Sequence, residues 1–208
     1  MQWVTKSINR YNNETFLYFS FVMSKGTTSY RIKDENGLYF LTFSTVEWID
    51  VFTSKKYRDI IVESLAYCIS EKGLELCSWV IMSNHIHLVA RAKEGYKLTA
   101  ILRDMKKFTS KRIVKEIKES SESRRDWLLL VMKNVAAQNS KQQNYQLWRN
   151  DNHPIILYSN AVIKQKVYYI HQNPVVSGLV FKAEDYVYSS AVDYSGERGL
   201  LPITLVNN

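Results

Sequence analysis

The sequence Trp79-Val-Ile-Met-Ser-Asn-His-Ile-His-Leu-Val-Ala-Arg91 contains two short apolar segments joined by a polar turn. Because side chains alternate along a strand, we expect a β-hairpin in which His85 and His87 point to one face while Ile86 and Leu88 point to the other. Two imidazoles on one face, roughly 6–7 Å apart at their Cα atoms, can share one divalent cation. The alternative interpretation is a half-buried strand whose histidines alternate without binding a metal.

Segments on both sides of this hairpin predict an α+β fold. Residues 38–44 are rich in β-formers and predict a central strand, and residues 74–80 predict the first strand of the hairpin. Between them, an apolar stripe predicts a helix that begins at residue 53 or 54 and ends near residue 71. This β-α-β-β order begins a ferredoxin-like sandwich, in which helices pack on a central antiparallel sheet. Residues 152–158 are expected to supply the last strand or an extended segment.

The composition indicates a single domain with a polyanionic partner. The chain has 208 residues, 46% of them apolar, and a net charge of +8, which favours nucleic acid over an anionic membrane as partner. Its two cysteines, Cys68 and Cys77, form no CxxC pair, so zinc-finger and redox motifs are excluded, and two reduced cysteines fit a cytoplasmic protein. The early apolar run at 16–23 is far too short to span a bilayer, so no membrane association is predicted.

Two regions are expected to lie outside the regular fold. Residues 1–22 differ in character from the rest of the chain, and we expect them to form an extension whose deletion leaves activity intact. Residues 23–208 are then expected to form a single domain. Within it, residues 120–145 predict a flexible polar insert that contains a short buried helical turn at Trp127–Met132.

A helix predicted over residues 97–119 carries an excess of positive charge. Its expected buried face holds apolar residues at helical spacing, namely Leu98, Ile101, Leu102, Met105 and Phe108. An ordinary solvated helix would mix signs more evenly, so we interpret the remaining surface as contacting phosphates, with a solvated face as the alternative. The predicted contact residues are Lys106, Lys107, Lys111, Arg112, Lys115 and Arg149. Trp148 is either a base-stacking residue or an ordinary packed tryptophan.

A further helix is predicted to begin at Ser159 or Asn160 and to end just before Pro174. Apolar residues at i, i+4 and i+7 mark its buried stripe. The helix carries two pairs of a phenol and an amide at i, i+4 on opposite flanks of this stripe: Tyr169 with Asn173, and Tyr168 with Gln172. Only one flank can face the histidines, and the spacing does not choose between them. The alternative is an amphipathic helix with half-buried tyrosines at its edges.

A phenol beside a metal site suggests phosphodiester chemistry. A tyrosine can attack a phosphodiester, release a 3′-hydroxyl and remain linked to the 5′-phosphate. The ordinary pKa of the phenol is near 10, so the reaction needs help at neutral pH. A divalent cation on the scissile phosphate provides this help by neutralising developing charge.

The motifs resemble those of the single-tyrosine HUH transposases, the IS200/IS605-like superfamily, and in particular its branch associated with repetitive extragenic palindromes (REP). The resemblance rests on His85-Ile-His87 after Met82-Ser-Asn84, and on Tyr169-Ile-His-Gln-Asn-Pro-Val-Val-Ser-Gly-Leu-Val180. The segments Trp148-Arg-Asn-Asp-Asn-His-Pro154 and Asp185-Tyr-Val-Tyr-Ser-Ser190 also resemble that branch. The similarity covers roughly residues 30–200.

The resemblance implies an enzyme that cuts and transfers single-stranded DNA and requires Mg²⁺ or Mn²⁺. By residue matching, Tyr169 corresponds to the nucleophile on a C-terminal helix, and His85, His87 and Asn173 correspond to the metal ligands. Relatives of the insertion-sequence type have Gln at the third ligand position, so Asn173 points to the palindrome-associated branch. That branch implies a DNA hairpin as substrate and a monomer, whereas a dimer with exchanged helices is the alternative.

Three other functions compete with this interpretation. The first is a DNA-binding regulator of the same fold that no longer cuts. The second is a relaxase-like or replication-initiator enzyme, although such enzymes usually carry additional domains or a third histidine. The third is a basic domain that binds RNA or the ribosome, where we would expect exposed aromatics on the sheet in place of paired histidines.

Overall fold

The computed structural model describes residues 31–139, 144–150 and 152–206. The extension expected at residues 1–22 lies outside these residues. Within them, an antiparallel sheet of four strands has the order β2-β3-β1-β4. The strands are β1 (Tyr39–Ser44), β2 (Leu74–Ile81), β3 (His85–Ala92) and the short β4 (Ile155–Ile156).

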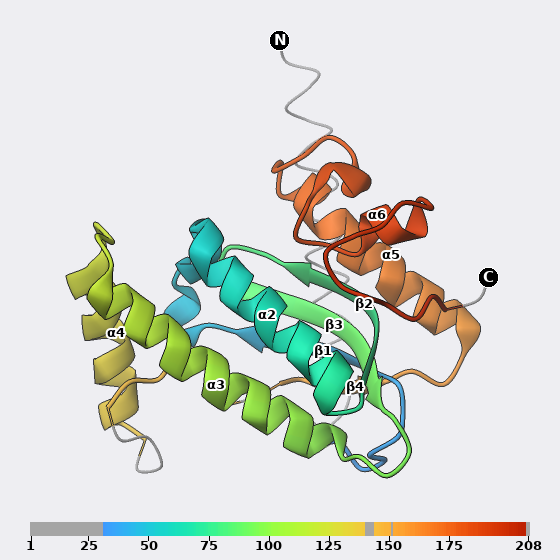
Figure 1. Cartoon of the computed structure of the whole chain (residues 1–208), viewed down its shortest axis with the longest axis horizontal. Coiled ribbons are helices and arrows are strands. Elements are labelled where there is room, and N and C mark those ends of the chain that lie inside the picture. Colours follow the sequence, from blue (N-terminus) through green and yellow to red (C-terminus); the bar gives the residue numbers. More distant parts are fainter. Residues whose placement is uncertain (1–30, 140–143, 151, 207–208) are drawn as a thin grey trace, which may run out of the picture.

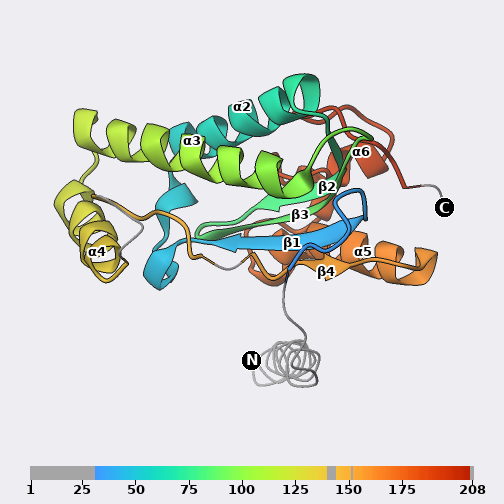
Figure 2. The same cartoon turned by 90° about the horizontal axis from the view of Figure 1, so that it is seen from below.

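Helices cover both faces of the sheet. Helices α2 (Lys55–Glu71) and α3 (Leu98–Glu119) lie on one face and α5 (Asn160–Val176) lies on the other, as Figure 2 shows. The remaining helices are α4 (Arg125–Ala137) and α6 (Ala191–Tyr194), with 3₁₀ turns η1 (Val46–Trp48), η2 (Val51–Thr53) and η3 (Ala183–Asp185). The α+β sandwich with a central antiparallel sheet is therefore confirmed (Figure 1).

The main core fills the space between the sheet and helices α2 and α3. The fully buried Phe43 pairs in register with Ile86, and Leu41 pairs with Leu88, so these four side chains share one face. The opposite face of the same strands presents Thr42 and both histidines to α5. No helix in the described residues is both long and apolar enough to cross a membrane.

Helix α4 is longer than the short turn predicted within the polar insert. It spans 13 residues, and Leu128, Met132 and Ala136 form its buried stripe at i, i+4 and i+8. The prediction underestimated the helix because the continuous apolar run ends at Met132, where the polar residues Lys133 and Asn134 follow it.

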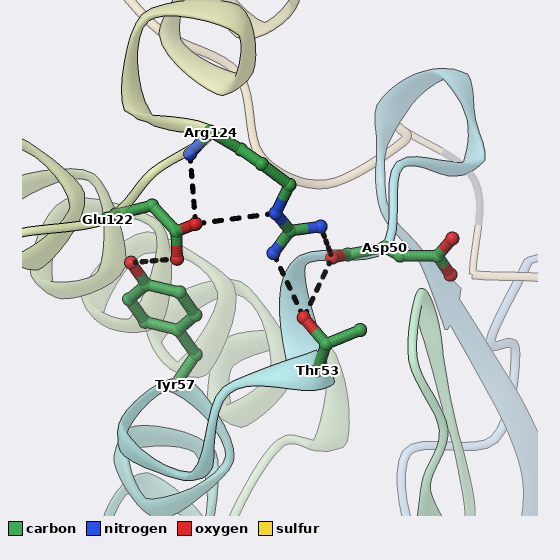
Figure 3. A network of polar contacts seen from close by, with 5 residues as sticks. All are labelled: Asp50, Thr53, Tyr57, Glu122 and Arg124. Carbon is green, nitrogen blue, oxygen red and sulfur yellow. Dashed lines mark hydrogen bonds and ion pairs between the residues drawn. The ribbon is translucent and has the colours of Figure 1, made fainter.

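A polar network anchors the start of α4 (Figure 3). The Arg124 guanidinium donates to the carbonyl of Asp50 at 2.9 Å, to Oγ1 of Thr53 at 2.9 Å and to the Glu122 carboxylate at 3.3 Å. Glu122 also accepts a hydrogen bond from the hydroxyl of Tyr57 at 3.2 Å, and burial raises the pKa of that phenol to about 12. The network ties the α3–α4 connection to the loop between β1 and α2.

On α3, the predicted buried stripe is wrong at Phe108, which is 51% exposed. The buried position is Thr109, four residues after the buried Met105. Its hydroxyl donates to the carbonyl of Met105 at 2.8 Å and accepts the indole N–H of Trp148 at 3.0 Å. A threonine with both hydrogen-bonding roles filled can replace an apolar residue in the core.

Helix α5 does not end before Pro174 as predicted but continues to Val176. It ends where Gly178 adopts a φ of 73°. There the N–H of Gly178 bonds to the carbonyl of Val175 at 3.0 Å, and the N–H of Leu179 bonds to that of Pro174 at 2.9 Å. This is a Schellman motif, so the glycine ends the helix, and the proline costs only one hydrogen bond of its last turn.

The C-terminal segment holds α5 against β2. Ser189 bridges to Val80, so the segment lies along the outer edge of β2. The hydroxyl of Ser190 lies 2.9 Å from Nε2 of His171 on α5 and 3.1 Å from the hydroxyl of Ser78 on β2. It also accepts the backbone N–H of Trp79 at 2.9 Å. Three separate parts of the chain therefore meet in one buried polar cluster.

This cluster predicts a stability defect for Ser190→Ala. The change leaves the Trp79 N–H and His171 with fewer buried partners, so we expect the free energy of unfolding to fall by about 1–3 kcal/mol. Urea denaturation measures it, with Ser195→Ala as the matched control because that hydroxyl bonds only to Val192 in an exposed turn. An unchanged midpoint for Ser190→Ala would contradict the role given to the cluster.

Candidate active site

The two histidines of β3 lie side by side on the face covered by α5. Their ring centroids are 4.7 Å apart. His87 is buried, with its ring stacked on Phe40 at 5.2 Å and edge-on to Tyr169 at 5.4 Å. The shared face results from the alternation of β3, as the sequence predicted.

Asn84 fixes the proton position on His85. Its amide nitrogen donates to the carbonyl of Trp48 at 3.2 Å, so its amide oxygen faces the imidazole. Nδ1 of His85 lies 2.7 Å from that oxygen and must donate to it. Nε2 of a neutral His85 therefore carries the lone pair, which is the form that binds a metal.

His87 has one satisfied and one unsatisfied ring nitrogen. Nδ1 lies 2.9 Å from the hydroxyl of Thr42, its register partner on β1. Nε2 is buried and has no hydrogen-bond partner among the described residues. Leaving a buried polar atom unpaired is costly, so an orphaned imidazole nitrogen beside a second histidine fits a metal ligand.

Both histidines are held in the neutral form. Burial lowers the pKa of His85 to about 4, with a hydrogen bond to Asn173 opposing the shift. Burial also lowers the pKa of His87 well below its ordinary value, and the nearby His85 and Lys166 lower it further. Both rings are therefore ready to bind a cation at neutral pH without first losing a proton.

Helix α5 turns Tyr169 toward the histidines and Tyr168 away from them. Tyr168 is 67% exposed, whereas the ring of Tyr169 packs edge-on to both His87 and Phe40, at 5.4 and 5.9 Å. The side-chain nitrogen of Asn173 donates to the carbonyl of Tyr169 at 2.9 Å. The structure thus brings together Tyr169, Asn173, His85 and His87 and leaves Tyr168 outside.

The surroundings of the Tyr169 hydroxyl act in opposite directions. Burial raises the pKa of Tyr169, while a hydrogen bond to Asn173 lowers it. Lys166, one turn earlier, lies 5.8 Å from the centre of the Tyr169 ring and 4.9 Å from that of Phe40. Burial lowers the pKa of this lysine. Its positive charge favours a phenolate at Tyr169 by simple Coulomb attraction.

The donor set suits a divalent cation with open coordination positions. The described residues contain no group of three or more His, Cys, Asp or Glu side chains with metal-binding geometry, so the third ligand here would be an amide. Nε2 of His85 and His87 with the side-chain oxygen of Asn173 give two nitrogens and one oxygen. Imidazole nitrogen suits transition metals better than Mg²⁺, so this set favours Mn²⁺ over Mg²⁺.

A basic groove of about 1220 Å³ runs between α3 and residues 144–150, 152 and 154. Among the predicted contact residues, those lining it are Lys106, Lys107, Lys111, Lys115 and Arg149. Arg112 is exposed but does not line it. The ammonium of Lys106 donates to the carbonyl of Arg149 and to the side chain of Asn152, both at 2.7 Å, so this lysine also holds the groove wall together.

Comparison with known proteins finds a family similarity over part of the chain. Residues 35–128 match the family model described as "Transposase IS200 like". Over these residues, which make up a little under half of its length, the chain is similar to the IS200-like transposases. The match includes both histidines of β3 and ends before α5, which carries Tyr169. No curated protein matches the chain.

The chain also shares its fold with a solved structure. That structure is a REP-associated tyrosine transposase bound to a REP hairpin, with a TM-score of 0.56 and 18% sequence identity. The alignment covers 88% of this chain and 93% of the other. The common architecture therefore extends beyond the family-model match and includes most of the C-terminal half.

Sequence analysis assigned no role to three residues that support the site. Thr42 contacts His87 only through the pairing of β1 with β3, which the sequence does not show directly. Asn84 and Lys166 lie close in sequence to His85 and Tyr169, but their spacing alone indicated no role. Trp148, one candidate for base stacking, is 4% exposed and packs at 5.4 Å against Phe52. The exposed tryptophan near the histidines is instead Trp48, whose ring lies 6.0 Å from that of His85.

The site geometry leads to a testable prediction about Mn²⁺ binding. Replacing His87 by Ala removes a buried donor, so we expect the affinity for Mn²⁺ in calorimetric titration to fall at least about tenfold. Asn84→Ala frees the His85 ring to change tautomer and is expected to cost roughly 10- to 100-fold. His153→Ala, outside the site, is the control. Unchanged Mn²⁺ affinity in His87→Ala would exclude this ligand set.

Proposed function

We propose that this protein is a transposase, namely a metal-dependent endonuclease and strand transferase for single-stranded DNA that acts through a covalent 5′-phosphotyrosine on Tyr169. The observation that carries the proposal is the packing of the Tyr169 ring, 5.4 Å from that of His87, over a pair of neutral histidines. A nucleophile and a cation-binding pair thus share one buried face of the sheet.

The proposed reaction exchanges one phosphoester bond for another. The Tyr169 oxygen attacks the phosphorus, forms a P–O bond and loses its proton to solvent, while the bond to the 3′-oxygen breaks. That oxygen takes up a proton and leaves as a 3′-hydroxyl. The phosphoester energy is retained in the tyrosine link, so a second 3′-hydroxyl can reverse the step and join strands without a nucleotide cofactor.

The residues around Tyr169 have separate roles in this proposal. His85, His87 and Asn173 would hold Mg²⁺ or Mn²⁺, which when bound neutralises charge on the scissile phosphate. Asn173 also bonds back to the Tyr169 carbonyl at 2.9 Å and so fixes the angle between nucleophile and ligand set. Lys166 favours the phenolate, and the apolar ring of Phe40 limits access of water to it.

The proposed substrate is a DNA hairpin with single-stranded flanks. The basic groove offers cationic side chains in a row along α3, which suits a duplex stem held by its phosphates. The solved relative is itself bound to a REP hairpin, and Asn173 matches the palindrome-associated branch. We further propose that the protein acts as a monomer in the cytoplasm, with a helix-exchanged dimer as the alternative.

A regulator that binds DNA without cutting is the second interpretation, and the site argues against it. A binding module has no need for an unpaired buried Nε2 on His87 or for a tyrosine packed over it. The RNA-binding interpretation is weakened as well, because α5 covers the sheet face on which an RNA-binding sheet displays its aromatics (Figure 2).

Substitution of each tyrosine by phenylalanine tests which of the two, Tyr169 or Tyr168, is the nucleophile. We expect Tyr169→Phe to abolish the covalent adduct with labelled hairpin DNA and Mn²⁺ on a denaturing gel, because the attacking oxygen is gone. Binding of the hairpin under native conditions should change by less than about twofold, because the ring and its packing remain. Tyr168→Phe, the matched control on the exposed flank, should keep the adduct.

The opposite result for the two tyrosines would move the nucleophile to Tyr168 and make Gln172 the better ligand candidate. Native complexes without any adduct, on hairpins with a pool of flanks, would favour the non-cutting regulator.

Charge reversal on α3 tests the groove. Lys111→Glu removes a cation that we expect to contact phosphate, so the hairpin should bind more weakly and the slope of log K against log salt should fall by about 1. Lys133→Glu, an exposed lysine of α4 outside the groove, is the control. If the slope of log K against log salt is the same for both variants and the wild type, α3 is an ordinary solvated helix that does not contact phosphates.

A further inference from the structure

We propose that Trp48 is a stacking platform for one base of the single-stranded flank, at the point where the strand passes from the basic groove to Tyr169. This inference rests on the proposed function and adds a positioning residue to it. Its ligand is a nucleotide next to the scissile phosphate, of any sequence, because every base has a flat face.

Trp48 lies between the two parts of the proposed DNA path. Trp48 is 51% exposed, and the centroid of its ring lies 6.0 Å from that of the His85 ring in an edge-on arrangement. The guanidinium of Arg149 lies 5.8 Å from the centre of the same indole, and Arg149 also lines the basic groove. A strand that runs from the groove to the histidines therefore meets this tryptophan and its arginine.

The backbone at Trp48 is in a conformation that bulky residues rarely adopt. Glu47 and Trp48 have consecutive positive φ angles of 49° and 53°, where glycine or asparagine is the ordinary choice. Such conformations persist only where surrounding contacts enforce them, and they are concentrated at functional sites.

Several hydrogen bonds enforce this conformation. The carbonyl of Trp48 accepts from Asn84 at 3.2 Å, and its N–H donates to the carbonyl of Thr45 at 3.3 Å. The hydroxyl of Thr45 lies 2.8 Å from the carbonyl of Ile49. Downstream, Arg124 holds the carbonyl of Asp50 (Figure 3). The loop is thus secured on both sides of an indole that remains in solvent.

Asn84 connects this platform to the chemistry. The same amide that holds the Trp48 carbonyl accepts the proton of His85 at 2.7 Å. A base stacked on Trp48 is consequently positioned relative to the metal-binding nitrogen through one short chain of contacts. Arg149 beside the indole adds a cation that attracts the phosphate of the same nucleotide.

The other tryptophans near the path do not offer this surface. Trp148 is buried, and its indole N–H donates to the hydroxyl of Thr109 at 3.0 Å, as is usual for a buried tryptophan. Trp127 is 49% exposed, but it lies on α4 and does not line the groove. Trp127 therefore serves as a control of equal chemistry and similar exposure.

The test is a double-mutant cycle between Trp48 and the bases of the flank, in the full chain carrying Tyr169→Phe so that binding stays reversible. The probe is a labelled hairpin with thymidine flanks, intact or with one abasic residue placed at successive positions. We expect Trp48→Ala to weaken binding roughly 5- to 100-fold, Trp48→Phe to restore most of it, and Trp127→Ala to have no effect. At one flank position, the abasic hairpin should bind the Tyr169→Phe protein more weakly than the intact hairpin does. The protein that also carries Trp48→Ala should bind the abasic and intact hairpins equally well.

Two results would overturn the inference: equal affinities for Trp48→Ala and Trp127→Ala, or losses that multiply at every flank position, as independent effects do. Covalent capture by the protein with Tyr169 intact, tested in parallel, separates the two claims. If the protein captures DNA covalently but Trp48 shows no energetic coupling to any flank base, only the stacking platform is rejected. If the protein neither captures nor binds the hairpin, the proposed function is rejected together with the platform.

Discussion

The register between β1 and β3 is the constraint on which the site depends. Thr42 pairs with His87 and Ser44 with His85, so both imidazoles face α5 while Ile86 and Leu88 enter the core. A slip of one residue would exchange these sets and bury two neutral histidines among apolar side chains. Because Leu41, Phe43, Ile86 and Leu88 are all fully buried, the core itself enforces the register, and packing on the far side of the sheet determines the geometry of the site.

The position of α5 is the second requirement, and the motifs near the C-terminus explain it. His171, two residues after Tyr169, bonds to Ser190 of the C-terminal segment and to Ser78 of β2. Tyr186 of the same segment donates to the carbonyl of Ile81 at 2.8 Å. The segment that resembles the palindrome-associated branch therefore holds the tyrosine helix against the sheet.

Local patterns predicted the fold and part of the site. The alternation at His85 and His87 and the order of elements were sufficient for the sheet, because a period of two and a helical stripe are local signals. The spacing on α5 left Tyr168 and Tyr169 equivalent. The family resemblance favoured Tyr169, and in the structure it is Tyr169 that packs against Phe40 and His87. The predictions that failed have both local and long-range causes. Pro174 indicated a helix end, but Gly178 supplies the turn that ends it, and Thr109 is buried in place of Phe108 because Trp148, far along the chain, provides a partner for its hydroxyl.

In the proposed mechanism, the phenol of Tyr169 becomes linked to DNA beside a metal held by His85, His87 and Asn173. The sharpest test digests the wild-type protein after reaction with hairpin DNA and Mn²⁺ and locates the nucleotide-bearing residue by fragmentation mass spectrometry. We expect a phosphonucleotide on Tyr169, formed with Mn²⁺ and not with EDTA. A modification on Tyr168, or one that forms equally in EDTA, would contradict this mechanism.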